Sequence, residues 1–211
     1  CPNTNTQNVT INALDDASFA YGAAAYCADA TDPNPTITGL AGGTFSSTVG
    51  LSINASTGTI DVSASTPGAY TVTYTTTGTC LNTSTVSVTV NALDDPGFNF
   101  ASASYCISGT DPSAAITGLA GGTFTSTAGL VINVSTGQID VSASTIGVNT
   151  VTYTTNGTCP NSATASITIL SADDAAFTMT ATCDGGTASS PGTSGGVFSL
   201  VGSPAGVSID P

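Results

Sequence analysis

The sequence predicts an all-β fold made of tandem immunoglobulin-like β-sandwich repeats. Short segments alternate apolar residues with Thr and Ser, and no segment keeps an apolar period of 3.6 residues. Turn-forming residues, 24 Gly and 10 Pro, separate these segments. The chain also copies itself, because the stretch 50–76 returns with few changes as 129–155. A repeated, turn-rich and β-branched sequence is typical of an array of small β-domains.

The repeat length follows from markers that keep a single offset. Paired aspartates recur with the first of each pair at Asp15, Asp94 and Asp173 (94 − 15 = 79), and the Tyr-Cys and Gly-Thr-Cys motifs recur at the same spacing. Two adjacent segments of this length align without a gap and are identical at 49 positions, so we treat them as two whole repeats. The chain then divides into the tail of a preceding repeat, two whole repeats and a partial, diverged repeat: 1–13, 14–92, 93–171 and 172–211. We expect it to be a section of a longer repetitive protein.

Each element of a repeat is predicted from local alternation and the turn that ends it. In the first repeat, a strand around 19–21 continues toward 26–27, and Pro-rich and Gly-rich turns lead to the next two strands. Gly58 supplies the positive φ for a tight turn in a β-meander. About seven strands result, which is the number expected for an immunoglobulin-like sandwich, and the later ones lie around 36–38, 44–46, 51–53, 60–62, 72–74 and 85–90.

The charged residues exclude several classes of function. The chain has no Lys, Arg, His or Glu, and its 13 Asp give a formal charge of −13. Because no side chain can neutralise phosphates, we expect no nucleic-acid partner. Ser and Thr lack an activating base, and the Asp61 and Asp140 carboxylates, one per repeat, are expected at strand edges rather than in a catalytic pair. We therefore predict neither an enzyme nor a cofactor.

The paired aspartates of Leu-Asp-Asp lie where one repeat meets the next, and two interpretations of them stay open. Grouped carboxylates at such a place suit Ca²⁺, which takes 6–8 oxygen ligands, and Asp32 and Asp111 would then approach the same region. The alternative is a solvated polar turn. The sequence offers no Glu for a bidentate contact and no Asp-x-Asp spacing, so we assign no metal ligand.

The six cysteines predict disulfides, because a sandwich as small as one repeat buries a modest core. We expect Cys27 to bond Cys80 and Cys106 to bond Cys159. Each bond would close a loop of about 54 residues and stabilise its repeat by roughly 4 kcal/mol in the chain-entropy model. Two alternatives remain, which are free buried thiols or bonds across each junction: Cys1–Cys27, Cys80–Cys106 and Cys159–Cys183. Either set of bonds requires an oxidising, extracellular compartment.

One long motif resembles a known class of repeats. Leu-x-Ile-Asn-x-Ser-Thr-Gly-x-Ile-Asp-Val-Ser-Ala-Ser-Thr and the following Thr-Val-Thr-Tyr-Thr-Thr-x-Gly-Thr-Cys occur in both whole repeats. They look like the tandem Ig-like or PKD-like repeats of giant Bacteroidetes surface proteins, including adhesins of the SprB type used in gliding motility. The resemblance implies export, a cell-surface location and a stalk or filament role.

We therefore expect a structural segment of an extracellular adhesin. Its partners would be the flanking repeats and, through regions outside these 211 residues, a surface or glycan ligand; the segment carries no run that would insert into a membrane. Two alternatives belong to other classes. One is a carbohydrate-binding or other recognition module of a secreted enzyme, and the other is a self-assembling extracellular filament subunit.

Overall fold

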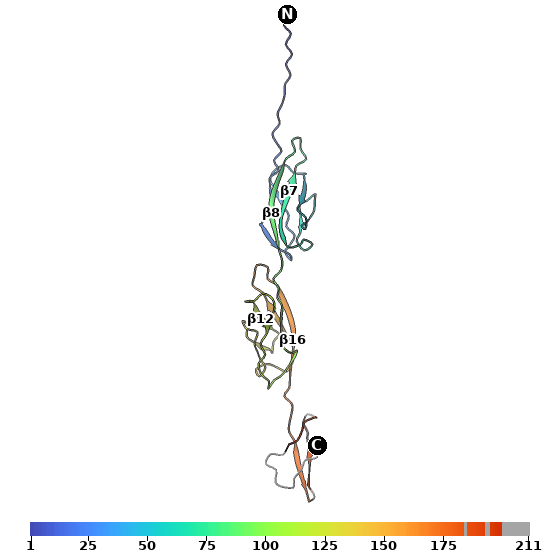
Figure 1. The fold of residues 1–211 in the computed structure, drawn as a ribbon, viewed down its shortest axis with the longest axis vertical. Helices are drawn as coiled ribbons and strands as arrows, with labels where there is room; N and C mark the ends of the chain where they lie inside the picture. The colour runs from blue at the N-terminus through green and yellow to red at the C-terminus, as the bar shows by residue number, and fades with distance from the viewer. Residues whose placement is uncertain (184, 193–194, 200–211) are drawn as a thin grey trace. The chain divides into compact units, whose positions relative to one another are not determined.

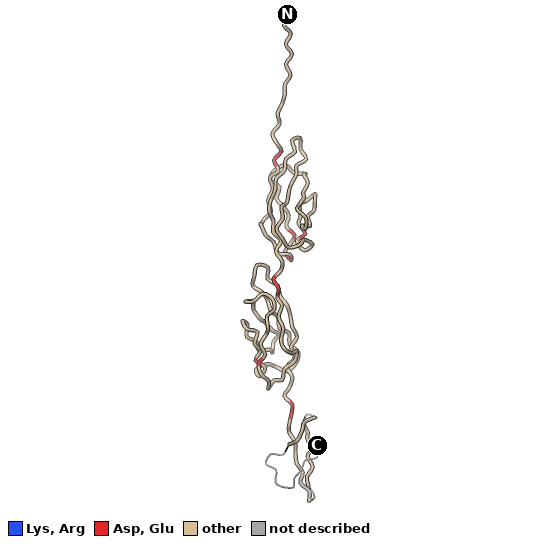
Figure 2. The backbone as a smooth tube through the Cα atoms, viewed as in Figure 1, with Lys and Arg blue, Asp and Glu red and all other residues tan. Residues whose placement is uncertain are grey.

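The structure is a computed structural model that describes residues 1–183, 185–192 and 195–199. Over this part of the chain every regular element is a strand, and the strands form separate small sheets (Figure 1). The predicted all-β, immunoglobulin-like sandwich fold is therefore confirmed. Figure 2 shows that the only charged residues along the backbone are acidic.

The first repeat folds as one four-stranded sheet facing two small two-stranded sheets. The four-stranded sheet has the order β2-β8-β7-β4, and the smaller ones pair β1 with β3 and β5 with β6. The strands are β1 Phe19–Ala20, β2 Ala25–Cys27, β3 Thr36–Ile37, β4 Thr44–Ser47, β5 Ser52–Ile53, β6 Ile60–Asp61, β7 Gly68–Thr75 and β8 Thr83–Asn91.

The second repeat has the same topology strand for strand. Its four-stranded sheet has the order β10-β16-β15-β12, and β9 pairs with β11 and β13 with β14. The strands are β9 Phe98–Asn99, β10 Ser104–Cys106, β11 Ala115–Ile116, β12 Thr123–Ser126, β13 Val131–Ile132, β14 Ile139–Asp140, β15 Gly147–Thr154 and β16 Ser162–Leu170.

The core of the first repeat forms where the alternation predicts it. Val72 and Tyr74 on β7 are fully buried, and Phe45 on β4 places its ring centroid 4.6 Å from that of Tyr74 and 5.5 Å from that of Phe19. Tyr74 also donates a hydrogen bond of 2.7 Å to a loop carbonyl and accepts one of 2.8 Å from a loop amide, those of Leu40 and Gly43. The ring therefore fills the core while its hydroxyl fixes the glycine-rich loop.

The predicted meander is present, and its turn depends on Gly58. Ile53 on β5 pairs with Ile60 on β6 in an antiparallel register, and Gly58 between them has a φ of +74°. A Cβ at that position would lie 2.8 Å from the Phe45 ring, so the turn needs glycine for its backbone conformation and for space.

In each four-stranded sheet one pair of neighbouring strands runs parallel, β2 with β8 and β10 with β16, which the alternation of residues did not predict. Tyr26 of β2 lies opposite Val90 of β8, and Cys27 lies opposite Asn91, the last residue of that strand. In the second repeat Cys106 lies opposite Leu170 in the same register. A cysteine that ends β2 or β10 is therefore at the end of the sandwich where the last strand finishes.

The partial repeat contains a single hairpin among its described residues, in which β17 (Thr178–Thr182) pairs with β18 (Gly185–Ser189). Phe177 and Phe198 pack edge to face with ring centroids 5.3 Å apart, like the Phe19–Phe45 pair of the first core. The part of this repeat predicted for 200–211 lies outside the described residues.

Contacts along the chain define two compact units that do not coincide with the repeats. The first unit contains 1–99, 115–123 and 153–163, and the second contains the remainder. The predicted repeat boundaries stay a prediction. Residues 1–13 form no strand, and Val9 and Ile11 are exposed, whereas their counterparts one repeat later, Val88 and Val90, are buried on β8. This segment has the sequence of a last strand without the sandwich that would bury it.

Candidate functional site

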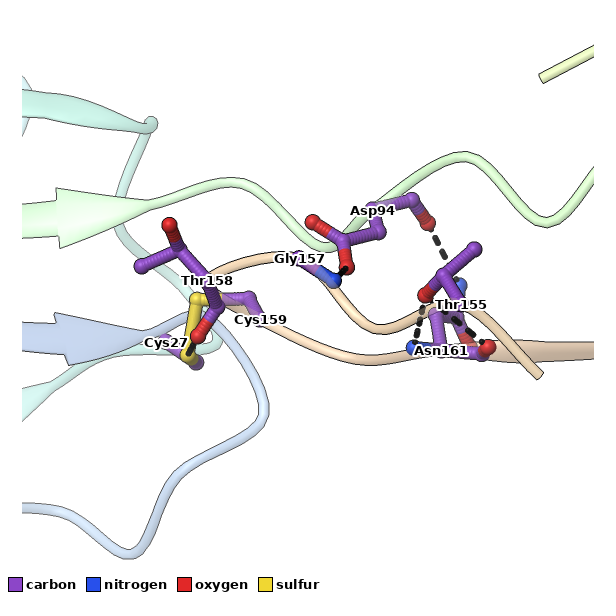
Figure 3. Close-up of a disulfide and its surroundings, with 7 residues drawn as sticks. All are labelled: Cys27, Asp94, Thr155, Gly157, Thr158, Cys159 and Asn161. Atoms are coloured by element: carbon purple, nitrogen blue, oxygen red, sulfur yellow. Dashed lines mark hydrogen bonds between the residues drawn. A yellow bond between two sulfur atoms is a disulfide. The ribbon is translucent and has the colours of Figure 1, made fainter. Parts of the chain in front are cut away.

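A disulfide between Cys27 and Cys159 is the chemical feature that distinguishes this chain from a plain series of sandwiches (Figure 3). Its Cα atoms are 5.6 Å apart, which is a usual separation for a disulfide, and the two cysteines are 132 positions apart in sequence. Both cysteines belong to the first compact unit, although one comes from the first repeat and the other from the second. The bond therefore links two consecutive repeats covalently.

This connectivity differs from the expected pairs Cys27–Cys80 and Cys106–Cys159, and from the alternative set across the junctions. Cys80 precedes the start of β8, whereas Cys27 lies opposite its end. The extended strand β8 spans about 26 Å between its first and last Cα atoms, while a disulfide needs Cα atoms within about 7 Å. Cys80 and Cys106 are free thiols in this structure, as are Cys1 and Cys183.

The loop that holds Cys159 is fixed by the Leu-Asp-Asp segment at the start of the second repeat. The Asp94 amide donates to the Cys159 carbonyl at 2.8 Å, and the Gly157 amide donates to Asp94 Oδ2 at 2.9 Å. Asn161 donates its side-chain amide to the Asp94 carbonyl at 3.3 Å, and its backbone amide and carbonyl both bond to Thr155 (Figure 3). Cys159 is thereby held in one place and is buried.

Four other aspartates accept hydrogen bonds from backbone amides instead of converging. Asp16 and Asp95 each accept the amide two residues later, at 2.9 Å. Asp32 and Asp111, expected near Leu-Asp-Asp if they helped to bind calcium, accept amides of the β6 and β14 segments at 3.1 and 3.0 Å. No group of three or more acidic, Cys or His side chains suited to a metal gathers within the described part of the chain.

Asp61 and Asp140 are the last residues of β6 and β14, at the strand edges expected for them, and their carboxyl groups accept hydrogen bonds from the turns that follow. Asp61 accepts the Ala64 amide at 2.8 Å and the Ser63 hydroxyl at 2.9 Å, and these bonds lower the pKa of its carboxyl. The Ser142 hydroxyl and the Ala143 amide lower the pKa of Asp140 in the same way. A glycosidase acid needs the opposite shift, because it must keep its proton near neutral pH.

A pocket of about 450 Å³ in the partial repeat is lined in part by Phe177 and Phe198, and a smaller pocket of about 340 Å³ lies in the second repeat. The smaller pocket is lined by Asp111, Val131, Ile132, Asn133, Gln138 and Asp140. None of these side chains is aromatic, so the pocket lacks the flat apolar surface on which a sugar ring packs. Tyr70, whose counterpart in the second repeat is Asn149, is buried and donates a hydrogen bond to the Thr66 carbonyl, so it is no exposed platform either.

No helix among the described residues has the length and apolar character needed to cross a lipid bilayer.

Comparisons with known proteins assign no family. No family model and no curated protein matches the chain. Among solved structures it is similar to the protocadherin GammaB4 extracellular domain (16% identity, TM-score 0.31, covering 79% of this chain and 35% of that one). It is also similar to protocadherin Gamma B2 extracellular cadherin domains 3–6 (14%, 0.34, 76% and 53%) and to mouse cadherin-23 EC22–24 (14%, 0.33, 78% and 69%). At these scores the likeness supports no argument about activity or partners.

Proposed function

We propose that this chain is a section of the stalk of a long, repetitive cell-surface adhesin, with disulfides joining its consecutive repeats. The Cys27–Cys159 bond is the observation that supports this function best. A bond within one domain limits the extension of that domain alone, whereas a bond between consecutive repeats keeps most of two repeats from being drawn out. That property is useful where tension acts along the chain.

The compartment follows from the same bond, since disulfides persist outside the reducing cytosol. The adhesive end of the protein, its surface or glycan ligand and its anchor would lie outside these residues. A role in gliding motility or surface attachment agrees with the resemblance to the repeats of SprB-type adhesins.

Removal of residues 14–171 from the complete gene tests the stalk role, because it deletes two whole repeats and keeps the order of the rest. A stalk predicts a shorter surface protein with the same ligand preference. Loss of ligand preference at normal surface abundance would contradict it and favour a recognition module. A glycan array probed with the 211-residue chain gives an independent result, because a stalk segment binds no glycan specifically.

A further inference from the structure

Each whole repeat contains two cysteines at fixed places, and the disulfide uses one from each repeat. The first place is the end of β2 or β10, occupied by Cys27 and Cys106. The second is the Thr-Gly-Thr-Cys loop before β8 or its equivalent before β16, occupied by Cys80 and Cys159. The bond joins the strand-end cysteine of the first repeat to the loop cysteine of the second. It leaves one cysteine of each kind, Cys80 and Cys106, as a thiol.

Cys80 lies in the same hydrogen-bonded loop as the bonded Cys159. The Asp15 amide donates to the Cys80 carbonyl at 2.9 Å, as Asp94 does to Cys159 at 2.8 Å. The Asn82 side-chain amide donates to the Asp15 carbonyl, and the Thr76 hydroxyl accepts the Asn82 amide, both as in the second repeat. The loop that holds a bonded cysteine in the second repeat is therefore already formed in the first.

Cys106 lies in the same backbone setting as the bonded Cys27. In each repeat the residue after the cysteine donates to the last residue of the final strand, from Ala28 to Asn91 at 3.0 Å and from Ile107 to Leu170 at 2.9 Å. The cysteine carbonyl then accepts the amide three residues later, at 3.0 Å for Cys27 and 2.9 Å for Cys106. Both halves of the bond are thus present a second time, each without its partner.

Neither thiol has a disulfide partner within its own repeat, because the length of the last strand separates the two places. We propose that Cys80 and Cys106 form the same bond with adjacent repeats, so that the array is a continuous ladder of disulfides. Cys80 would bond the strand-end cysteine 132 positions before it, and Cys106 the loop cysteine 132 positions after it, the separation found for the existing bond. The ladder depends on the repeat geometry and not on what the adhesin binds.

The chemistry is thiol–disulfide exchange with an external disulfide, such as that of an oxidoreductase or oxidised glutathione. One cysteine thiolate attacks the external disulfide to give a mixed disulfide and releases one external thiolate. The thiolate of the second cysteine then attacks the protein sulfur of the mixed disulfide and releases the other. The two cysteines lose two protons and two electrons, and the external disulfide becomes two thiols.

The test lengthens the full chain by a second copy of residues 93–171, placed directly after the first copy. Cys106 then has a loop cysteine in the added repeat. The lengthened chain is refolded with oxidised glutathione, quenched with acid and alkylated in denaturant, and the alkylated thiols are counted by mass. The present chain has four free thiols. The ladder predicts four again, although the lengthened chain has two more cysteines, and a disulfide-linked peptide joining Cys106 to the added loop.

Cys106→Ser in the lengthened chain separates the ladder from a bond inside the added repeat. The ladder predicts five free thiols, because the added loop cysteine loses its partner, whereas a bond within the added repeat predicts three. Six free thiols in the unsubstituted lengthened chain would also overturn the proposal. Cys80→Ser is the matched control, since it must keep the peptide that links Cys106 to the added loop. The count is made in denaturant, so no variant has to stay folded while its thiols are counted.

Discussion

Reduction of the Cys27–Cys159 bond should lengthen the pulled chain by a predictable amount. In the oxidised protein, tension applied at the two termini passes through the disulfide and bypasses the 132 residues of sequence separation between its cysteines. An extended residue adds about 3.4 Å, so the bypassed segment corresponds to about 450 Å of contour length. Most of the first repeat and most of the second lie in this segment. Neither sandwich should extend fully under load until the bond is broken.

Single-molecule pulling with handles on terminal tags, rather than on thiols, measures this length. The oxidised chain should give a short contour, and addition of a reductant should release about 450 Å together with the unfolding events of two sandwiches. Cys27→Ser should reproduce the reduced result without reductant. Cys80→Ser removes a thiol that this chain leaves free and should keep the short contour.

Two outcomes would refute this reasoning. A contour that does not change on reduction would show that the bond is absent. The second outcome is a disulfide within each repeat, in which case tension would bypass two equal segments, from Cys27 to Cys80 (80 − 27 = 53) and from Cys106 to Cys159 (159 − 106 = 53). Reduction would then lengthen each of two unfolding steps by about 180 Å, and both steps would already occur in the oxidised chain.

Three further predictions concern the sandwiches. Tyr74→Phe leaves the buried Gly43 amide and the partly buried Leu40 carbonyl without their hydrogen bonds to the tyrosine, and it should lower the free energy of unfolding by about 1–3 kcal/mol in denaturant titration. Tyr153→Phe should do the same in the second repeat, and unchanged midpoints would contradict this. Burial raises the pKa of Tyr21 to about 12, so the unfolded chain loses this proton first and stability should fall as pH rises from about 10 to 12. Tyr21→Phe should remove that fall in thermal melts, and the second repeat, with Phe100 at this place, should lack it. The pKa of Asp61 is lowered in the folded chain, so its carboxylate contributes stability above pH 3.8, the ordinary pKa, and this contribution is lost as the pH falls below that value. Asp61→Asn should therefore make the melting temperature fall less steeply as the pH is lowered below 3.8.

The sequence predicted the parts of the fold that depend on neighbouring residues. Val72 and Tyr74 are buried because a strand with one face on the core has a period of two, and that period is visible in a single segment. The turn at Gly58 was predictable for the same reason, since its positive φ is a local requirement. The place of Asp61 at the edge of a strand was predictable too, and its hydrogen bonds are local, with the Ser63 hydroxyl and the Ala64 amide as donors.

The disulfide could not be predicted from such local patterns. Ala25–Cys27 is only three residues long, and nothing in it specifies a partner strand or a parallel direction. The number of strands in a repeat was the one feature of the sequence that indicated at which end of the sandwich each cysteine lies. In a sandwich of about seven strands, the loop before the last strand lies at the end where the repeat begins, and the hydrogen bond from Asp15 to Cys80 places it there. That signal separates Cys80 from the end of the last strand, where Cys27 lies.

In the proposed ladder, successive bonds overlap, and the shortest covalent path through the array is much shorter than the chain. A path that leaves one bond at Cys80 follows the backbone only as far as Cys106 before it enters the next bond (106 − 80 = 26), once for every two repeats (2 × 79 = 158). A fully unfolded ladder therefore reaches about 90 Å per pair of repeats, against about 540 Å for the reduced chain. The extension is thus limited about sixfold by covalent bonds, whatever the stability of each sandwich. The small cores of these repeats, with no ion pairs between side chains to support them, are then sufficient for a protein under tension, because a domain that opens adds little length and can refold between fixed ends.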